Sequence, residues 1–285
     1  MKKNGWNRNW LLMIVALLSF TLLAAGCGTS QPEAGNQQNT GAGNEQANTG
    51  DTNNQSGEGT AEKTYVVGTD AIYPPFEKME ADKISGFDID VINAIAEAAG
   101  MKIEIKHTGW DPLFDGIEKG TVDLGISAIT ITDDRKQKYD FTEPYFEANQ
   151  LIMVAEDSPV TKLADLKGMT IGVQGGTTGA IAVKKAFGDT YEGLREYEDT
   201  PSAVDDFFNG RVQAVVADNG VLSLYTKTAA GKKFKLLKDD SFEKEYYGIM
   251  VKKGNSELLE KLNQGLKTIQ DNGKLEEIHK QYFVQ

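Results

Sequence analysis

A repeated alternation of strand and helix patterns is the feature that most limits how this chain can fold. The first run comprises, in order, residues 64–69 (strand), 87–99 (helix), 102–106 (strand), 111–120 (helix) and 122–126 (strand). The second run repeats this order at residues 169–173, 179–187, 194–197, 200–210 and 212–216. Within these runs, residues 117–124 and 207–214, offset by 90 positions, both read as a helix end, a glycine, a polar residue and a strand. Because β-α-β-α-β order is typical of a parallel sheet covered by helices, we predict an α/β fold with two similar lobes.

Composition allows two folded lobes and argues against several kinds of site. The chain has 285 residues, of which 40% are hydrophobic, and no long apolar run lies beyond the N-terminus. Its net charge of −12 argues against nucleic acid as a partner. A single cysteine forms no internal disulfide, and two histidines, His107 and His279, without a cysteine pair argue against a zinc site. We therefore expect neither a metal nor a cofactor.

The N-terminal part has the pattern of an export signal followed by a tether. Residues 1–26 combine a positive start with an apolar core that ends in small residues. Residues 23–27 resemble a bacterial lipobox, although Ala24 stands where that pattern usually has Leu. We predict that the signal is removed and that Cys27 is lipidated; an ordinary signal with a chance cysteine is the alternative. Residues 27–63 are rich in Gly, Asn, Gln, Thr and Ser, so we predict a disordered tether.

Residues 126–135 change from the end of an apolar strand to a polar segment. Thr132 is predicted to cap a short helix that begins with two acids. Hydroxyl groups, the N–H groups of a helix start and the guanidinium of Arg135 thus converge, and this set of donors suits a carboxylate. Alternatively, Arg135 only pairs with one of the two adjacent aspartates on the surface. The candidate ligand residues in this stretch are Ser127, Ala128, Thr130 and Arg135.

Open α/β sheets bind ligands at the carboxyl ends of their strands, and two such ends in the second run carry polar residues. Residues 174–179 (Gln-Gly-Gly-Thr-Thr-Gly) join a strand to a helix and would present N–H groups to an anion. No Lys-Ser/Thr follows, which excludes a nucleotide-binding P-loop. Asp218 ends an apolar strand and suits an α-ammonium group, or else caps the helix of residues 219–229. The candidates here are Gln174, Thr177, Thr178 and Asp218.

Three further candidates follow strands of the first run: Asp70, Tyr73 and Trp110. The two aromatic residues are able to sandwich a ligand side chain, although single aromatic residues often belong to a core. Asp70 remains as an unpaired acid that can meet a basic side chain. With the carboxylate and ammonium partners above, these residues indicate a free α-amino acid as ligand. We interpret Asp88 as the cap of the helix that follows it, in preference to a contact with a basic ligand side chain.

From Thr64 to Phe283 the chain resembles the polar-amino-acid solute-binding proteins of bacterial ATP-driven importers. The matching motifs are Gly68-Thr69-Asp70 with Pro75-Phe76, Gly86-Phe87-Asp88, Ile129-Thr130-Ile131-Thr132 with Arg135, Asp140-Phe141-Thr142 with Tyr145, Leu166-Lys167-Gly168, and the terminal helix of residues 273–283. The resemblance implies a two-lobed periplasmic-binding-protein fold of type II, with two parallel-sheet lobes joined by two hinge strands. The implied boundaries are residues 64–146 and 247–285 for lobe 1, 147–246 for lobe 2, and crossovers near 145–149 and 245–249.

The same resemblance implies roles for the candidate residues. These are carboxylate binding for Arg135, aided by Thr130 and Thr178, ammonium binding for Asp218, packing on the ligand side chain for Tyr73 and Trp110, and positions near that side chain for Asp70 and Ser127. Glutamine binders of this family usually carry Lys at the position of Gln174 and His at the position of Ala217. That departure makes the chain more similar to the arginine/lysine/histidine binders, and an acid-rich pocket is consistent with a cationic ligand.

The family also implies a place and partners. We expect a monomer anchored by lipid to the outer face of the cell membrane, which captures an amino acid and delivers it to a permease with its ATPase. We expect no enzyme, because Ser127 has no histidine nearby in the pattern and both histidines lie outside the predicted cleft loops. The alternatives are a glutamine binder, an amino acid-sensing lipoprotein and an enzyme of the same fold.

Overall fold

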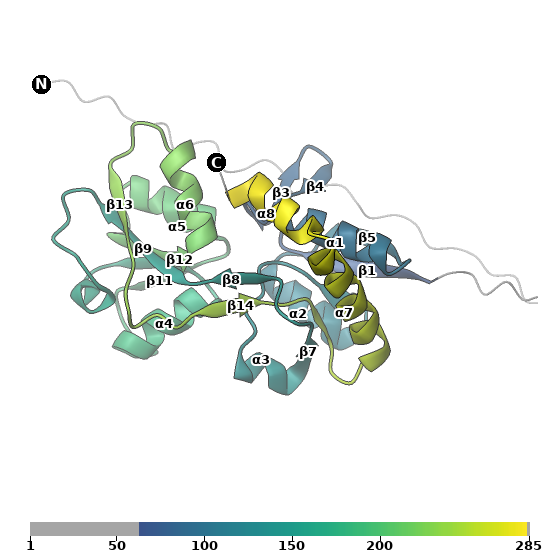
Figure 1. The fold of residues 1–285 in the computed structure, drawn as a ribbon. Coiled ribbons are helices and arrows are strands. Elements are labelled where there is room, and N and C mark those ends of the chain that lie inside the picture. Colours follow the sequence, from purple (N-terminus) through teal and green to yellow (C-terminus); the bar gives the residue numbers. More distant parts are fainter. Residues whose placement is uncertain (1–62, 284–285) are drawn as a thin grey trace, which may run out of the picture. The chain divides into compact units, whose positions relative to one another are not determined.

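The computed structural model describes residues 63–283, which contain two five-stranded sheets flanked by helices (Figure 1). The predicted signal, Cys27 and nearly all of the tether lie outside the described residues. Between Lys63 and Phe283, no helix combines the length and the apolarity needed to cross a membrane. The predicted two-lobed α/β architecture is confirmed.

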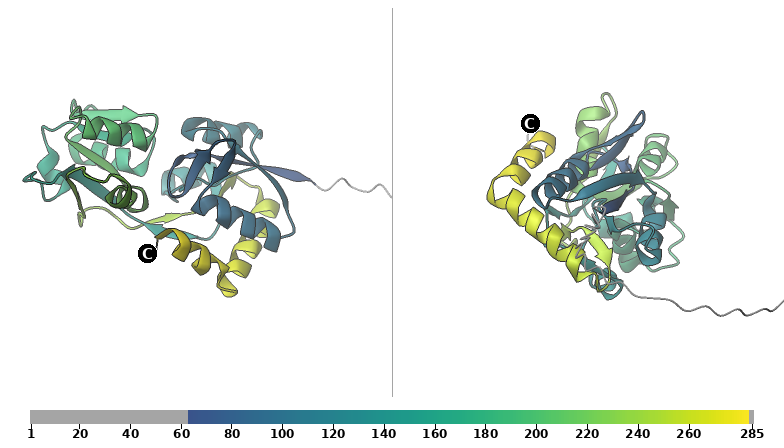
Figure 2. Two further views of the ribbon diagram at one scale, coloured as in Figure 1. Left: turned by 90° about the horizontal axis from the view of Figure 1, so that it is seen from above. Right: turned by 90° about the vertical axis from the view of Figure 1, so that its right-hand side faces the viewer.

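The first lobe is built on a sheet with the strand order β5-β1-β6-β15-β7. Its strands are β1 (Thr64–Thr69), β5 (Lys102–His107), β6 (Leu124–Gly125), β7 (Tyr139–Phe141) and β15 (Met250–Lys252). Successive residues of a strand face opposite sides, so Val67 packs with the core under α1 (Phe87–Ala98), while Val66 packs against the core under α2 (Trp110–Lys119). The C-terminal helices α7 (Ser256–Asp271) and α8 (Lys274–Phe283) join α1 on its side of the sheet (Figure 2).

The second lobe repeats this plan with the order β11-β10-β12-β9-β13. Its strands are β9 (Gln150–Ala155), β10 (Ile171–Gln174), β11 (Leu194–Tyr197), β12 (Ala214–Asp218) and β13 (Phe234–Leu237). Val216 faces a core shared with α4 (Thr178–Phe187), and Val215 faces the opposite core, shared with α5 (Thr200–Phe208) and α6 (Asn219–Thr228). A short 3₁₀ helix, Leu163–Leu166, lies between β9 and β10.

Two strands connect the lobes: β8 (Phe146–Ala148) and β14 (Glu245–Tyr247) pair in antiparallel fashion and run side by side in Figure 1. The strands that follow them, β9 and β15, each enter a sheet antiparallel to its other four strands. The sheets are therefore mixed rather than purely parallel. A strand that arrives through a hinge has no crossover helix before it, so nothing obliges it to run with its neighbours.

Local differences from the sequence prediction are small. The strand predicted for residues 122–126 is regular only at β6, and an antiparallel sheet that was not predicted lies between the first strand and the first helix. That sheet comprises β2 (Ile72–Tyr73), β3 (Glu77–Glu80) and β4 (Lys83–Ser85). Helix α3 (Asp133–Lys138) forms as predicted, with the Thr132 hydroxyl accepting the Arg135 N–H at 3.2 Å. Helix α7 was not predicted.

Candidate functional site

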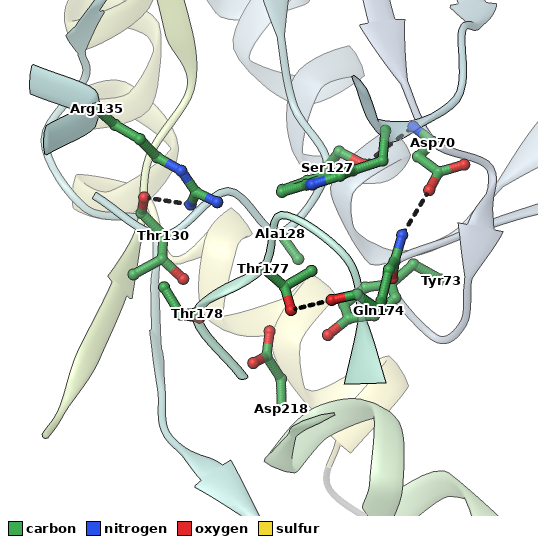
Figure 3. Close-up of a pocket in the computed structure, with 11 residues that line it drawn as sticks. Asp70, Tyr73, Ser127, Ala128, Thr130, Arg135, Gln174, Thr177, Thr178 and Asp218 are labelled. Atoms are coloured by element: carbon green, nitrogen blue, oxygen red, sulfur yellow. Dashed lines mark hydrogen bonds between the residues drawn. The ribbon is translucent and has the colours of Figure 1, made fainter. Parts of the chain in front are cut away.

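One pocket lies between the lobes, and all eleven candidate ligand residues of the sequence analysis line it (Figure 3). Lobe 1 contributes Asp70, Tyr73, Trp110, Ser127, Ala128, Thr130 and Arg135, and lobe 2 contributes Gln174, Thr177, Thr178 and Asp218. Most of them stand at the carboxyl ends of strands β1, β6, β10 and β12 or in the loops that follow, as open α/β sheets favour. Among residues 63–283, no group of His, Cys, Asp and Glu side chains is arranged to hold a metal ion.

Arg135 points into this pocket from helix α3 rather than pairing with its neighbouring aspartates. Its Nη1 donates to the Thr130 carbonyl at 2.8 Å, and its Nη2 crosses to lobe 2 and donates to the Gly176 carbonyl at 3.2 Å. The guanidinium also lies 5.3 Å from the ring of Trp110 and 5.4 Å from that of Phe114. Burial lowers the pKa of Arg135 to about 10, which still leaves the group charged at neutral pH. A fixed, partly desolvated cation therefore faces the pocket.

Asp218 supplies the opposing charge from lobe 2. It occupies the N-cap position of α6, yet its side chain makes no capping hydrogen bond, so the alternative of a simple helix cap is wrong. Instead the carboxylate accepts hydrogen bonds from the Gln150 amide and from the hydroxyls of Tyr247 and Tyr73. Burial raises the pKa of Asp218 to about 6, and the nearby Glu245 adds to the shift. These neutral donors leave its negative charge without a cationic partner, which an ammonium group would supply.

Asp70 is the third charged residue that lines the pocket. Gln174 of lobe 2 donates from Nε2 to Asp70 Oδ2 at 3.2 Å, and the amide is itself oriented by the Thr200 hydroxyl, which donates to Gln174 Oε1 at 3.1 Å. The backbone N–H of Asp70 donates to Ser127 Oγ at 3.0 Å. Burial raises the pKa of Asp70, because its charged form is desolvated. The bond between Gln174 and Asp70 joins the two lobes across the pocket, as does the bond between Arg135 and Gly176.

His107 lies closer to the site than the sequence indicated. Its Nδ1 is 3.9 Å from Asp70 Oδ1, and the ring lines a neighbouring cavity that Asp70 also borders. The same Nδ1 accepts the backbone N–H of Ala71 at 3.0 Å, which places the proton of a neutral ring on Nε2. Neither histidine lines the pocket, but strand β5 continues to His107 at the carboxyl edge of the sheet and so brings its ring close to Asp70.

The two predicted aromatic residues, Tyr73 and Trp110, line the pocket and also contact neighbouring side chains. The Tyr73 ring is stacked on Phe76 at 6.1 Å between centroids, and its hydroxyl points to Asp218. The Trp110 ring meets Phe114 edge-on at 4.9 Å and supports Arg135. Each ring thus orders a charged group of the pocket while presenting apolar surface to it.

Comparison with known proteins agrees with this geometry. The family described as bacterial extracellular solute-binding proteins, family 3, matches residues 65–285. The chain belongs to this family. A solved member, the arginine-, lysine-, histidine-binding protein ArtJ from Geobacillus stearothermophilus, superimposes with a TM-score of 0.76 at 48% identity, covering 78% of this chain and 96% of ArtJ. The predicted family and its two-lobed fold are thereby confirmed.

Two curated relatives extend the comparison. The arginine-binding extracellular protein ArtP of Bacillus subtilis is 31% identical over 284 residues, covering 97% of this chain and 98% of ArtP. The probable histidine-binding protein of Neisseria gonorrhoeae is 37% identical over 224 residues, covering 78% of this chain and 84% of that protein. This family 3 protein therefore has relatives named for binding basic amino acids.

Two polar residues of the hinge region were missed by the sequence analysis. Glu245, at the start of β14, accepts the hydroxyls of Thr130 at 2.7 Å and Thr178 at 2.8 Å, one from each lobe. Gln150, at the start of β9, donates to Asp218 and, at 3.0 Å, to the other oxygen of Glu245. A possible signal was the polar Gln150 at the head of an otherwise apolar strand that continues a predicted crossover.

Asp88 corrects another interpretation. Helix α1 has no side-chain cap, and Asp88 instead accepts the Ala128 N–H at 2.7 Å and the Tyr145 hydroxyl at 2.8 Å. The first of these bonds holds Ala128 in a left-handed conformation (φ 48°) that costs an L-residue about 1–2 kcal/mol. The favoured helix cap was therefore wrong, because a tertiary contact uses the carboxylate to shape the pocket wall.

Glu77 lies beside Asp88 and is fully buried. Its Oε1 accepts the hydroxyl of Ser127 at 2.9 Å, and the two carboxyl groups are hydrogen-bonded to each other. Burial raises the pKa of Glu77 well above its ordinary range, and burial raises that of Asp88 to about 7. Asp88 accepts hydrogen bonds from two other groups and Glu77 from only one, so the negative charge is better stabilised on Asp88. We therefore place the shared proton on Glu77. The pair supports two residues of the pocket, Ser127 and Ala128.

Proposed function

We propose that this protein is the extracytoplasmic substrate-binding component of an amino acid ABC importer, and that it captures arginine, lysine or histidine between its lobes. The observation that carries the proposal is the opposition of Arg135 on lobe 1 and Asp218 on lobe 2 across one pocket. A carboxylate suits the guanidinium, and an ammonium group suits the buried carboxylate. A free α-amino acid carries both groups on one carbon.

The charge of the pocket favours a basic amino acid. Its eleven lining residues include two acids, Asp70 and Asp218, and one base, Arg135, so their formal charge is −2 + 1 = −1. The zwitterionic part of an amino acid is neutral and matches Arg135 and Asp218. Asp70 is then left for a cationic side chain, whose charge would offset the burial that raises the pKa of Asp70. The names of ArtJ, ArtP and the Neisseria relative support the same ligand class.

Capture operates by closure. Ligand held by Arg135 of one lobe and Asp218 of the other binds the closed arrangement better than an open one, and so shifts the population toward closure. The paired strands β8 and β14 are the only polypeptide links between the sheets within residues 63–283, so bending there suffices to move the lobes. The closed form would then dock on a permease that works with an ATPase, the protein acting as a monomer.

The N-terminal segment supports an anchored location. Lipidation of Cys27 would hold the protein on the outer face of the cell membrane, because each buried CH₂ contributes about 0.8 kcal/mol. A Cys27→Ser variant should then leave the membrane fraction for the medium. A variant that stays with the membrane would contradict the anchor without affecting the binding proposal.

The polar groups of the pocket do not form a catalytic set, and we propose binding rather than catalysis. Ser127 Oγ donates to Glu77 and accepts from the Asp70 backbone, so its hydroxyl has no histidine base. The Nδ1 of His107 is occupied by the Ala71 N–H. Formation of a product from arginine, lysine or histidine would contradict this assignment.

Calorimetric titration tests the proposal. The protein, freed of bound ligand by unfolding and refolding, is titrated with arginine, lysine, histidine and glutamine, beside an Arg135→Ala variant checked for folding by circular dichroism. We expect at least one basic amino acid to bind the wild type and none to bind the variant. Binding of glutamine alone would overturn the assignment to basic ligands, and near-normal titration of the folded variant would overturn the role of Arg135.

A further inference from the structure

Glu245 stands behind the pocket rather than in its wall. It lines an adjacent cavity that also reaches Thr130 and Thr178, the two threonines that border both spaces. Its Oε2 accepts the hydroxyl of Thr130 at 2.7 Å and that of Thr178 at 2.8 Å, and its Oε1 accepts the Gln150 amide at 3.0 Å. One carboxylate of a hinge strand thus holds a hydroxyl from each lobe.

These bonds determine whether the two hydroxyls act as donors or as acceptors toward a ligand in the pocket. A threonine hydroxyl has one hydrogen to donate and two lone pairs to accept with. Because both hydrogens are directed at Glu245, only oxygen lone pairs remain for a ligand: those of Thr130, and one of Thr178, whose other lone pair accepts the Gln150 amide at 3.2 Å. An acceptor repels a ligand carboxylate and suits an N–H group. The resemblance assigned these hydroxyls to the carboxylate; their geometry assigns them to the ammonium group.

An α-ammonium group has three N–H bonds to satisfy. Asp218 offers one charged acceptor in the pocket, and the hydroxyl oxygens of Thr130 and Thr178 complete a set of three. The carboxylate of the ligand would then rely on Arg135 and on N–H groups at the start of α4, where the N–H of Ala180 donates to the Thr177 hydroxyl and those of Thr178 and Gly179 precede it in the first turn. The two ends of the amino acid therefore meet separate sets of groups.

We propose that Glu245 is a positioning residue which, by taking the hydroxyl protons of Thr130 and Thr178, makes the pocket select ligands with a free α-ammonium group. The inference rests on the proposed function, since it concerns how the same pocket reads an amino acid. It adds to the site a residue that does not touch the ligand.

The role requires a carboxylate and not merely a polar side chain. Donors approach both oxygens of Glu245: two hydroxyls at Oε2 and the Gln150 amide at Oε1. An amide in this place would present its NH₂ either to the threonines or to Gln150. In the first case the hydroxyls must accept from it and turn their hydrogens toward the pocket. In the second case the NH₂ group of the substituted side chain faces the NH₂ group of Gln150, and the bond between Gln150 and Asp218 is disturbed.

Ligand analogues separate this role from a general structural one. The test compares wild type with Glu245→Gln, and with Glu147→Gln as a control, an exposed glutamate on the facing hinge strand β8 that pairs with Lys244. Each protein is titrated with arginine, with agmatine, which lacks the carboxylate, and with 4-guanidinobutanoate, which lacks the α-amino group. If lysine binds more tightly than arginine, the three probes are lysine, cadaverine and 6-aminohexanoate. If histidine binds most tightly, they are histidine, histamine and 3-imidazolylpropanoate.

We expect Glu245→Gln to weaken the amino acid and the amine by about 10- to 100-fold, and the amine-free acid by less than about threefold. Glu147→Gln should change none of them. An equal loss for all three probes, a loss confined to the amine-free acid, or unchanged affinity for the amino acid would each overturn the inference. If wild type binds no basic amino acid, the proposed function fails instead.

A second measurement needs the amino acid alone and covers the case of analogues too weak to titrate. Thr130→Val removes one hydroxyl while keeping the size of the side chain. If Glu245 acts through the hydroxyls, Glu245→Gln should cost less affinity in the Thr130→Val background than in wild type. Strictly additive losses in this cycle would refute the positioning role.

Discussion

Replacing Glu77 by glutamine should remove a pH dependence of stability that the buried carboxyl pair imposes. Glu77 is fully buried, accepts the Ser127 hydroxyl and is hydrogen-bonded to Asp88. Glutamine has the same shape: its oxygen accepts from Ser127, and its NH₂ donates to Asp88 as the shared proton does. The substitution therefore keeps the contacts and deletes only one titrating group.

The magnitude follows from proton linkage. Burial raises the pKa of Glu77 well above its ordinary range, so the folded protein retains this proton after the unfolded chain has lost it near its usual pKa of about 4.3. Above that pH Glu77 by itself gives the folded state one more proton than the unfolded chain, and its contribution lowers the free energy of unfolding by about 1.4 kcal/mol per pH unit. This loss continues for as long as Glu77 stays protonated in the folded protein, and Glu77→Gln should be spared it.

Urea unfolding followed by circular dichroism at a series of pH values measures this difference in the ligand-free protein. Relative to wild type, Glu77→Gln should gain up to about 1.4 kcal/mol of unfolding free energy per pH unit as the pH rises above about 5. Glu97→Gln, at an exposed position of α1, serves as control and should run parallel to wild type. Parallel curves for Glu77→Gln and wild type would show that Glu77 is ionised in the folded protein, and would refute the assignment of the shared proton.

Three further predictions concern single groups. Because burial raises the pKa of Asp218 to about 6, arginine affinity should fall up to tenfold per pH unit as the pH drops below 6. The Asp218→Asn variant should bind arginine weakly and with little pH dependence. A wild-type affinity that stays flat from pH 7 to pH 5 would contradict this prediction. Thr132→Ala should cost about 1 kcal/mol of stability in thermal unfolding and lower arginine affinity, since the lost cap orients Arg135; unchanged affinity would show that α3 needs no cap. Gly86→Ala should prevent normal folding, because its Cβ would lie 2.2 Å from the Phe76 carbonyl oxygen at a φ of 140°, and a native circular dichroism spectrum and melting temperature would refute it.

Features governed by local sequence could be predicted. The order of strands and helices follows from hydrophobic periodicity and glycine stops, and the cap at Thr132 involves a residue three positions away. The pocket residues could be located because strand ends in α/β sheets gather at one edge, which is where Asp70 and Asp218 lie. The family resemblance then linked these separate ends into one site.

Features that depend on distant partners could not be predicted. Glu245 is hydrogen-bonded to Thr130, which is 115 positions away in the chain, and to Gln150, which is 95 positions away. Asp88 shows why: at the start of a helix a cap is the favoured local role, yet Ala128, 40 positions away, takes its carboxylate in the folded protein. Pattern reasoning places a residue on an element, but which of several partners it satisfies depends on packing.

Gly176 has a consequence for how tightly the protein can bind. A Cβ at this position would lie 3.1 Å from Trp110 Nε1 on the opposite lobe, and the backbone already has a φ of 69°. With a larger residue here, Trp110 would have to move by a few tenths of an ångström for the lobes to reach the same closed arrangement. Since apparent affinity scales with the fraction of molecules able to close, the absence of a side chain at this loop position affects affinity separately from the choice of ligand.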